Sequence, residues 1–128
     1  MRVLVVENDR DTADTLALLL RLAHCEARVC YDGQSALETA IGFRPHLMLV
    51  DLGMPIMNGF EFAREVRERA ELDDTLLAAL TGYGDSEHRE RAVAAGFDEY
   101  LLKPVPFTAL SDFVERVRSI GTPARKAG

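Results

Sequence analysis

Short apolar runs alternate with helical stretches five times along the chain, and this alternation limits the possible folds more than any other feature. The runs that predict strands occupy residues 2–6, 26–30, 46–50, 76–80 and 99–102. Those at 2–6, 46–50 and 76–80 are almost continuously apolar, as expected of parallel strands covered on both faces. Apolar residues recur with helical spacing between the runs, as at Ala13, Leu16, Ala17 and Leu20. Strict alternation predicts an α/β fold with five helices around a parallel sheet, joined by right-handed crossovers.

The apolarity of the strands indicates their order in this sheet. If the three most apolar strands lie inside, the first, third and fourth are central, and the second and fifth are edges. This arrangement favours the order 2-1-3-4-5. The other common order, 3-2-1-4-5, would place the strongly apolar third strand at an edge.

Residues typical of helix ends stand between the predicted strands. Asn58 followed by Glu61 forms a capping-box pattern for the third helix, with Asn in place of the usual hydroxyl residue. Further start and stop signals are Asp32 and Gly42 for the second helix, Asp85 and Gly96 for the fourth, and Pro106 for the fifth.

Length and charge define the class of protein. A chain of 128 residues predicts one domain, which we place at 1–120, with 121–128 as a flexible tail or the start of a linker. The net charge of −6 argues against direct binding to nucleic acid or to anionic membranes. No apolar run reaches the roughly 20 residues of a membrane span. The two cysteines form neither a metal-binding pattern nor a disulfide framework, and we expect a cytoplasmic protein.

Polar side chains with complementary chemistry follow four of the predicted strands. Glu7, Asn8 and Asp9 come after the first strand, and Asp51 comes after the third. Because neighbouring parallel strands lie about 4.8 Å apart and end at the same edge, these residues should meet there. Carboxylate and amide oxygens suit a hard cation such as Mg²⁺.

Thr81 and Lys103 follow the fourth and fifth strands and add a hydroxyl and an ammonium group. A phosphoryl group uses both halves of such a site, because its transfer depends on positioning and neutralising its oxygens. A central carboxylate such as Asp51 can itself be the nucleophile. Lys103 stands out because thirteen of the fifteen basic residues are arginine. Alone, Asp51 would be an ordinary turn residue and Thr81 a helix cap; together with Lys103 they indicate a site.

Three sequence segments resemble the receiver domain of bacterial response regulators, including the chemotaxis regulators. They are "LMLVDLGMPIMNG" (47–59), "ALTGYG" (79–84) and "YLLKP" (100–104), and they accompany the acidic cluster after the first strand. The resemblance extends over residues 2–120. It implies a flavodoxin-like, doubly wound sheet and a role in two-component or phosphorelay signalling.

The resemblance also implies residue roles. Asp51 matches the phosphoacceptor. Glu7 and Asn8 match the acidic pair that binds Mg²⁺ together with Asp51 and the backbone carbonyl of Gly53. Asp9 is an additional candidate ligand, and capping of the first helix is its alternative role.

The other positions match the residues that recognise the phosphoryl group and signal its presence. Thr81 matches the hydroxyl residue that binds the phosphoryl group, and Lys103 matches the lysine that pairs with its oxygens, ahead of a Lys103–Pro104 bond that is usually cis. Tyr100 matches the aromatic switch residue that tracks Thr81; packing at an edge strand is its alternative role. Gly53 and Tyr83 occupy positions that tune dephosphorylation, and we predict that it is slow.

Asn8 departs from the family pattern. An amide oxygen still coordinates hard cations but brings no net charge, so we expect weakened Mg²⁺ binding.

The sequence favours a phosphoacceptor that receives its phosphoryl group from a histidine kinase or histidine phosphotransfer protein. It would not be an enzyme beyond catalysing its own phosphorylation and dephosphorylation. Its output would pass to a downstream protein through the face formed by the fourth helix, fifth strand and fifth helix. The alternative is a pseudo-receiver, a protein-binding module without phosphorylation, which Asn8 alone favours. A phosphohydrolase with a "D-x-D" motif is disfavoured because Gly53 stands at the second position.

Overall fold

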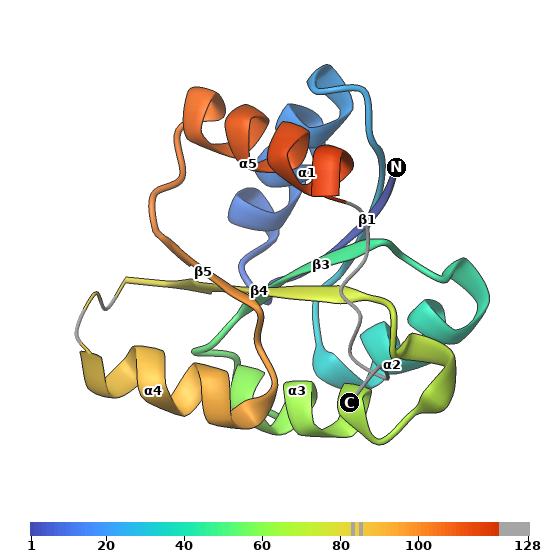
Figure 1. Ribbon diagram of the computed structural model, residues 1–128, viewed down its shortest axis with the longest axis vertical. Helices are drawn as coiled ribbons and strands as arrows, with labels where there is room; N and C mark the ends of the chain where they lie inside the picture. The colour runs from blue at the N-terminus through green and yellow to red at the C-terminus, as the bar shows by residue number, and fades with distance from the viewer. Residues whose placement is uncertain (83, 85, 121–128) are drawn as a thin grey trace.

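The chain folds into a five-stranded parallel sheet with helices on both faces (Figure 1). This computed structural model describes residues 1–82, 84 and 86–120. The strand order is β2-β1-β3-β4-β5, as the sequence predicts. The strands are β1 (Arg2–Val6), β2 (Glu26–Cys30), β3 (Leu47–Asp51), β4 (Leu76–Thr81) and β5 (Glu99–Leu102). The helices are α1 (Arg10–Leu22), α2 (Gly33–Phe43), α3 (Gly59–Arg67), a short 3₁₀ turn (Ala70–Leu72), α4 (Ser86–Ala95) and α5 (Phe107–Ile120).

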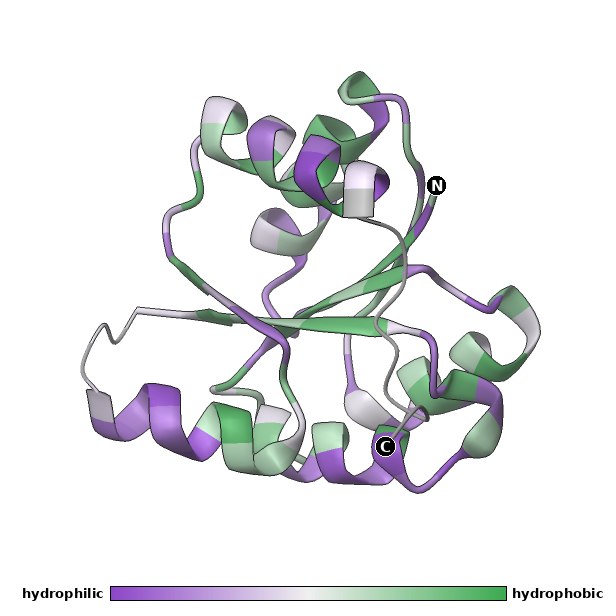
Figure 2. Ribbon diagram, viewed as in Figure 1, coloured by the Kyte–Doolittle hydropathy of each residue, from purple (hydrophilic) through white to green (hydrophobic). Residues whose placement is uncertain are grey.

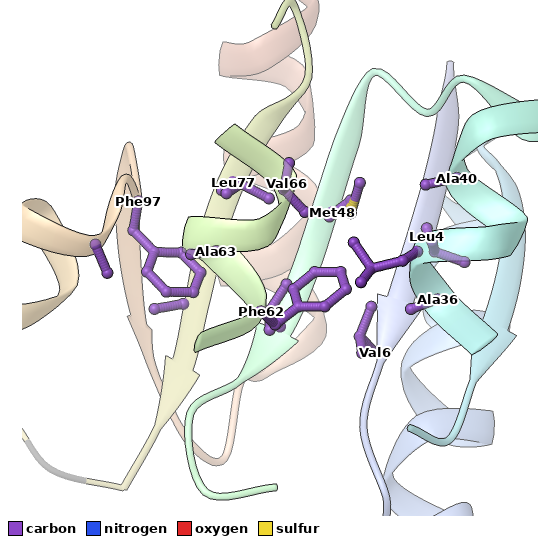
Figure 3. Packing of buried hydrophobic residues seen from close by; sticks show 14 of the residues in the cluster. Leu4, Val6, Ala36, Ala40, Met48, Phe62, Ala63, Val66, Leu77 and Phe97 are labelled. Atoms are coloured by element: carbon purple, nitrogen blue, oxygen red, sulfur yellow. The ribbon is translucent and has the colours of Figure 1, made fainter. Parts of the chain in front are cut away.

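Two hydrophobic cores fill the spaces between the sheet and its helices. α1 and α5 cover one face, and α2, α3 and α4 cover the other (Figure 1). Side chains of successive strand residues point to opposite faces, so Val3 and Val5 belong to the first core and Leu4 and Val6 to the second. Figure 2 shows the apolar character of the central strands, and Figure 3 shows Phe62 of α3 packed in the second core. Burial on both faces explains the nearly continuous apolar sequence of β1, β3 and β4.

Several predicted helix ends are confirmed. The Asp32 carboxylate accepts a hydrogen bond from the Ser35 amide (2.8 Å) at the start of α2. Asn58 and Glu61 form the reciprocal capping box of α3. Gly96 follows α4 with a φ of +112°, a left-handed conformation that favours glycine. Tyr83 and Asp85 lie outside the described residues, as does the predicted tail 121–128.

The predicted end of the second helix at Gly42 is wrong. α2 continues through Phe43, and Arg44 takes the left-handed conformation that ends it, with φ at 51°. The Phe43 side chain is 6% exposed within the second core, and the Arg28 guanidinium covers its ring. Burial of this aromatic side chain extends the helix beyond the glycine, because apolar packing outweighs the local preference of glycine for helix ends.

The bounds of two strands also differ by one residue from the prediction, at both ends of β3 and at the carboxyl end of β4. β3 covers Leu47–Asp51, and β4 extends to Thr81, so Asp51 and Thr81 are the last residues of their strands.

Pro106 immediately precedes α5, and its carbonyl accepts a hydrogen bond from the Leu110 amide (3.0 Å). No helix in the described part of the chain has the length and apolar character needed to cross a membrane.

Candidate functional site

The carboxyl ends of β1, β3, β4 and β5 bring the predicted site residues to one edge of the sheet. Glu7 directly follows β1, and its amide donates to the Cys30 carbonyl (3.1 Å), which continues the pairing with β2. Asp51 ends β3, the neighbour of β1, and Thr81 ends β4, the neighbour of β3. Lys103 directly follows β5, and its amide donates to the Thr81 carbonyl (2.8 Å). The parallel order of the strands therefore assembles the site.

A close backbone contact shapes the loop after Asp51. The Gly59 amide donates to the Leu52 carbonyl (3.2 Å) and draws the start of α3 against the end of β3. A Cβ atom on Gly59 would lie 2.7 Å from the Asp51 carbonyl oxygen and 2.7 Å from Leu52 Cα. Only glycine fits this contact. The glycine in the motif "MPIMNG" therefore has a positional role beside the site.

Lys103 bridges the two carboxylates of the site. Its Nζ lies 2.7 Å from Glu7 Oε1 and 3.0 Å from Asp51 Oδ1. The Gly53 amide also donates to Asp51 Oδ1 (3.1 Å). The peptide bond between Lys103 and Pro104 is cis, as the resemblance implied. The long lysine side chain thus spans the distance from β5 to β1 and β3.

The Asn8 side chain faces the other oxygens of the same two carboxylates. With its amide nitrogen turned toward them, Asn8 donates to Glu7 Oε2 (3.2 Å) and to Asp51 Oδ2 (3.3 Å). Asn8 itself is exposed, whereas Glu7 is 1% exposed and Asp51 is 7% exposed. The carboxylate pair is therefore buried and has a cation on one side and an exposed amide on the other.

The pKa values of both Glu7 and Lys103 are raised in the site, for different reasons. Burial, followed by the hydrogen bond with Asp51, raises the pKa of Glu7, and the Lys103 ammonium opposes this only in part. For Lys103, burial alone would lower the pKa, but the bonds to Glu7 and Asp51 outweigh burial and raise it. Lys103 therefore remains a cation at neutral pH.

Asp9 takes the capping role, the second of its two predicted roles. Its side chain accepts a hydrogen bond from the Thr12 amide (3.2 Å) at the start of α1 and also bonds the Thr12 hydroxyl. These bonds lower the pKa of the Asp9 carboxyl. The backbone amide of Asp9 donates to Glu7 Oε2 (3.3 Å). Asp9 thus supports the site through its backbone while its carboxylate is turned to the helix.

Thr81 and Tyr100 lie on the face of the sheet covered by α2, α3 and α4. Thr81 is 4% exposed. Tyr100 pairs in register with Ala79, two residues before Thr81, and its half-buried ring packs against the second core. The Arg89 guanidinium of α4 lies 4.8 Å from the ring centroid. Thr81 and Tyr100 therefore lie on the same face of the sheet, two register positions apart.

The donor set fits a hard divalent cation. Glu7 Oε2 and Asp51 Oδ2 converge on the Asn8 amide, so two carboxylate oxygens and one amide group face a common point. The Gly53 carbonyl is the predicted backbone ligand, and its residue contacts Asp51 through its amide. Among residues 1–82, 84 and 86–120, no group of three or more His, Cys, Asp or Glu side chains is placed to hold a metal. A cation held here would meet the two carboxylates and neutral oxygens, and this ligand set stays a prediction.

A groove that the sequence does not predict lies beside the site. It lies between α1 and the segment after β5, has a volume of about 520 Å³, and includes Lys103 in its wall. Its apolar lining comes from Leu16, Leu19, Leu80, Pro104 and Val105. These residues belong to segments far apart in the sequence, so no local pattern indicates the groove.

Comparison with known proteins decides the family. Residues 3–115 match the family described as "Response regulator receiver domain". The chain belongs to this receiver family. Chemotaxis protein CheY4 of Vibrio cholerae has the same fold at 29% identity, with a TM-score of 0.86 over 91% of this chain and 97% of that chain.

Two further proteins bear on the site and its context. The receiver domain of sensor histidine kinase PA1611 from Pseudomonas aeruginosa, solved with magnesium in its active-site cleft, is 26% identical. Its TM-score is 0.82 over 90% of this chain and 94% of that chain. The transcriptional regulatory protein PrrA of Mycobacterium tuberculosis is 33% identical over 93% of this chain. The matched region of this chain spans about half of PrrA, 49% of its length.

Proposed function

We propose that Asp51 accepts a phosphoryl group from the phosphohistidine of a histidine kinase or histidine phosphotransfer protein. An Asp51 carboxylate oxygen attacks phosphorus, an acyl phosphate bond forms, and the phosphorus–nitrogen bond breaks. The electron pair of that bond returns to the imidazole, which takes up a proton. The observation that carries this proposal is the buried Asp51 carboxylate at the carboxyl end of the sheet, with the Lys103 ammonium 3.0 Å away.

The neighbouring residues would hold the transferred group. Lys103 would move one of its hydrogen bonds from a carboxylate oxygen to a phosphoryl oxygen, and the Thr81 hydroxyl would bind a second oxygen. Glu7, Asn8, Asp51 and the Gly53 carbonyl would hold Mg²⁺, which neutralises developing charge on the phosphoryl oxygens. Because Asn8 adds no charge to this set, Mg²⁺ binding would be weakened.

Phosphorylation would be transmitted to the surface formed by α4, β5 and α5. The added charge and acceptor oxygens would draw in Thr81, and Tyr100 would follow on the same side of the sheet. This surface already exposes apolar side chains, with Val93 71%, Leu102 46% and Phe107 40% exposed. A downstream protein that binds these residues would read the state of Asp51. We propose that the output is protein binding, with no direct contact to nucleic acid or membrane and no enzymatic turnover of other substrates.

We also propose that Asp51 loses its phosphoryl group slowly. Gly53 carries no side chain that could orient an attacking water, and the position of its missing Cβ is 3.7 Å from Asp51 Oδ1. Tyr83, the second predicted tuning residue, lies outside the described residues. A phosphoryl half-life of only seconds would contradict this part of the proposal.

The alternative function is a pseudo-receiver that binds partners without phosphorylation, and the exchange of a carboxylate for Asn8 favours it. Amide NMR spectra of the wild type and Asp51→Asn with Mg²⁺ and beryllofluoride, a phosphoryl mimic, separate the two functions. The phosphoacceptor proposal predicts wild-type shifts at Thr81, Tyr100 and Lys103 that are absent in the variant. If the wild-type spectrum shows no change that depends on Asp51, the pseudo-receiver remains.

A further inference from the structure

Two side chains, Lys103 and Asn8, each contact one oxygen of both carboxylates, while the Gly53 and Asp9 backbone amides bond Asp51 Oδ1 and Glu7 Oε2. Glu7 Oε1 and Asp51 Oδ1 bind the Lys103 ammonium at 2.7 and 3.0 Å. Glu7 Oε2 and Asp51 Oδ2 lie 3.2 and 3.3 Å from the same side-chain amide atom of Asn8. Lys103 and Asn8 therefore close the carboxylate pair from opposite sides.

The chemistry of an amide gives this arrangement two states. When the Asn8 nitrogen faces the carboxylates, it supplies two N–H donors, one for each oxygen. When the Asn8 oxygen faces them, three oxygens meet and Asn8 supplies no hydrogen atom between them. Such a cluster repels itself unless a cation lies at its centre, and it is then a typical oxygen ligand set for Mg²⁺.

The surroundings of Asn8 permit both states. The side chain is exposed, so a half-turn about its last bond, a soft torsion, brings either end of the amide inward. The neighbouring carboxylate of Asp9 is bonded to Thr12 at the start of α1, so it does not compete for this position.

We propose that Asn8 occupies the cation position of the metal-free site and leaves it by a half-turn when Mg²⁺ enters. The amide nitrogen bridges Glu7 and Asp51 in the empty site, and the amide oxygen becomes a ligand in the loaded site. This inference rests on the metal site of the proposed function. It assigns Asn8 a positioning role that an aspartate could not perform, because a carboxylate offers only acceptors to its two neighbours.

The half-turn has a consequence for metal binding and for the metal-free protein. Mg²⁺ must displace two internal hydrogen bonds before it gains its ligands, so the wild type binds the ion more weakly than Asn8→Asp. The metal-free wild type gains in return, since its carboxylates are satisfied on both sides. A receiver with this device would keep its site ordered when Mg²⁺ is scarce.

The side-chain amide signals provide the direct test. The chain contains two Asn and one Gln, so three NH₂ pairs appear in a ¹⁵N NMR spectrum. In chelator-treated protein, we expect at least one Asn8 NH₂ proton to exchange slowly with water. Addition of Mg²⁺ should shift the Asn8 pair and abolish that protection. Asn58, whose amide oxygen caps α3, should not change and serves as the control within the same spectrum.

Three results would overturn the proposal. The first is rapid exchange of both Asn8 protons in the metal-free protein. The second is an unchanged Asn8 pair while the Gly53 backbone amide responds to Mg²⁺. The third is the absence of any response to Mg²⁺.

Denaturation of metal-free variants supplies a second, independent readout. Asn8→Ala removes the two donors, and Asn8→Asp replaces them with a third negative charge. Unfolding midpoints should therefore fall in the order wild type, Asn8→Ala, Asn8→Asp. If wild type and Asn8→Ala have equal midpoints without metal, the bridging amide is excluded. Neither test requires phosphorylation, so the half-turn can hold while Asp51 proves not to be a phosphoacceptor, and the reverse result is equally visible.

Discussion

Replacement of Lys103 by methionine, which keeps most of the length of the side chain and removes its charge, should destabilise the fold measurably. Lys103 Nζ bonds two carboxylates whose side chains are only 2% and 10% exposed. Removal of one partner from a fully buried ion pair costs about 3–5 kcal/mol. The Lys103 side chain is 30% exposed, so solvent screens part of this interaction. Glu7, whose burial already raises its pKa, can also take up a proton in the variant. We therefore expect a loss of about 2–3 kcal/mol at neutral pH.

Urea denaturation at neutral and acidic pH is the assay. For m-values of roughly 1–3 kcal/mol per M, the loss corresponds to a fall of about 0.7–3 M in the midpoint. The loss should shrink as the pH falls, because a protonated Glu7 can donate to Asp51. Arg116→Met is the matched control, since its guanidinium lies 3.8 Å from Glu99 between exposed side chains. Exposed pairs contribute about 0–1 kcal/mol. If Lys103→Met costs no more than this control, the bridge does not hold the carboxylate pair together.

Three further predictions concern the loop, the metal and the titration of the site. Gly59→Ala should lower the free energy of unfolding by about 3 kcal/mol, since its Cβ would lie 2.7 Å from backbone atoms at the end of β3; Gly42→Ala, where a Cβ meets nothing within 4 Å, is the control and should not destabilise. Asn8→Asp should bind Mg²⁺ about tenfold more tightly than wild type in calorimetric titration, because it adds a ligand charge; equal affinities would contradict this. Burial is the main reason that the pKa of Glu7 is raised. Protonated Glu7 therefore contributes stability below the ordinary carboxyl pKa of 4.5, and this contribution is lost as the pH rises through the folded pKa. In urea titrations, the free energy of unfolding of the wild type should therefore fall relative to that of Glu7→Gln as the pH rises through this window. A difference that stays constant with pH would contradict the raised pKa of Glu7.

The fold was predictable because its strongest signals are physical and local. Strands buried on both faces must be apolar along their whole length, and this requirement alone placed β1, β3 and β4 inside the sheet. Alternation of strands and helices then determined that Glu7, Asp51, Thr81 and Lys103 meet at one edge. The end of α2 was not predictable in the same way, because burial of Phe43 depends on neighbours from distant segments.

The contacts within the site were less predictable than its composition. No pattern in the sequence shows that Lys103 would bridge both carboxylates, because the bridge depends on the distance between strand ends and on the path after β5. Sequence alone also left two roles open for Asp9. The start of α1 decides between them, since its free amides need an acceptor and Asp9 is the residue at that position. Asn8 is consequently left to face the carboxylates.

Phosphoryl transfer to Asp51 can be measured directly by intact-protein mass spectrometry. Wild type and Asp51→Asn are incubated with Mg²⁺ and phosphoramidate, a small donor whose phosphorus–nitrogen bond resembles that of phosphohistidine. We predict that the wild type gains one phosphoryl group, that hydroxylamine removes it as expected of an acyl phosphate, and that the variant gains none. An unmodified wild type, or equal modification of both proteins, would contradict the assignment of Asp51 as the phosphoacceptor.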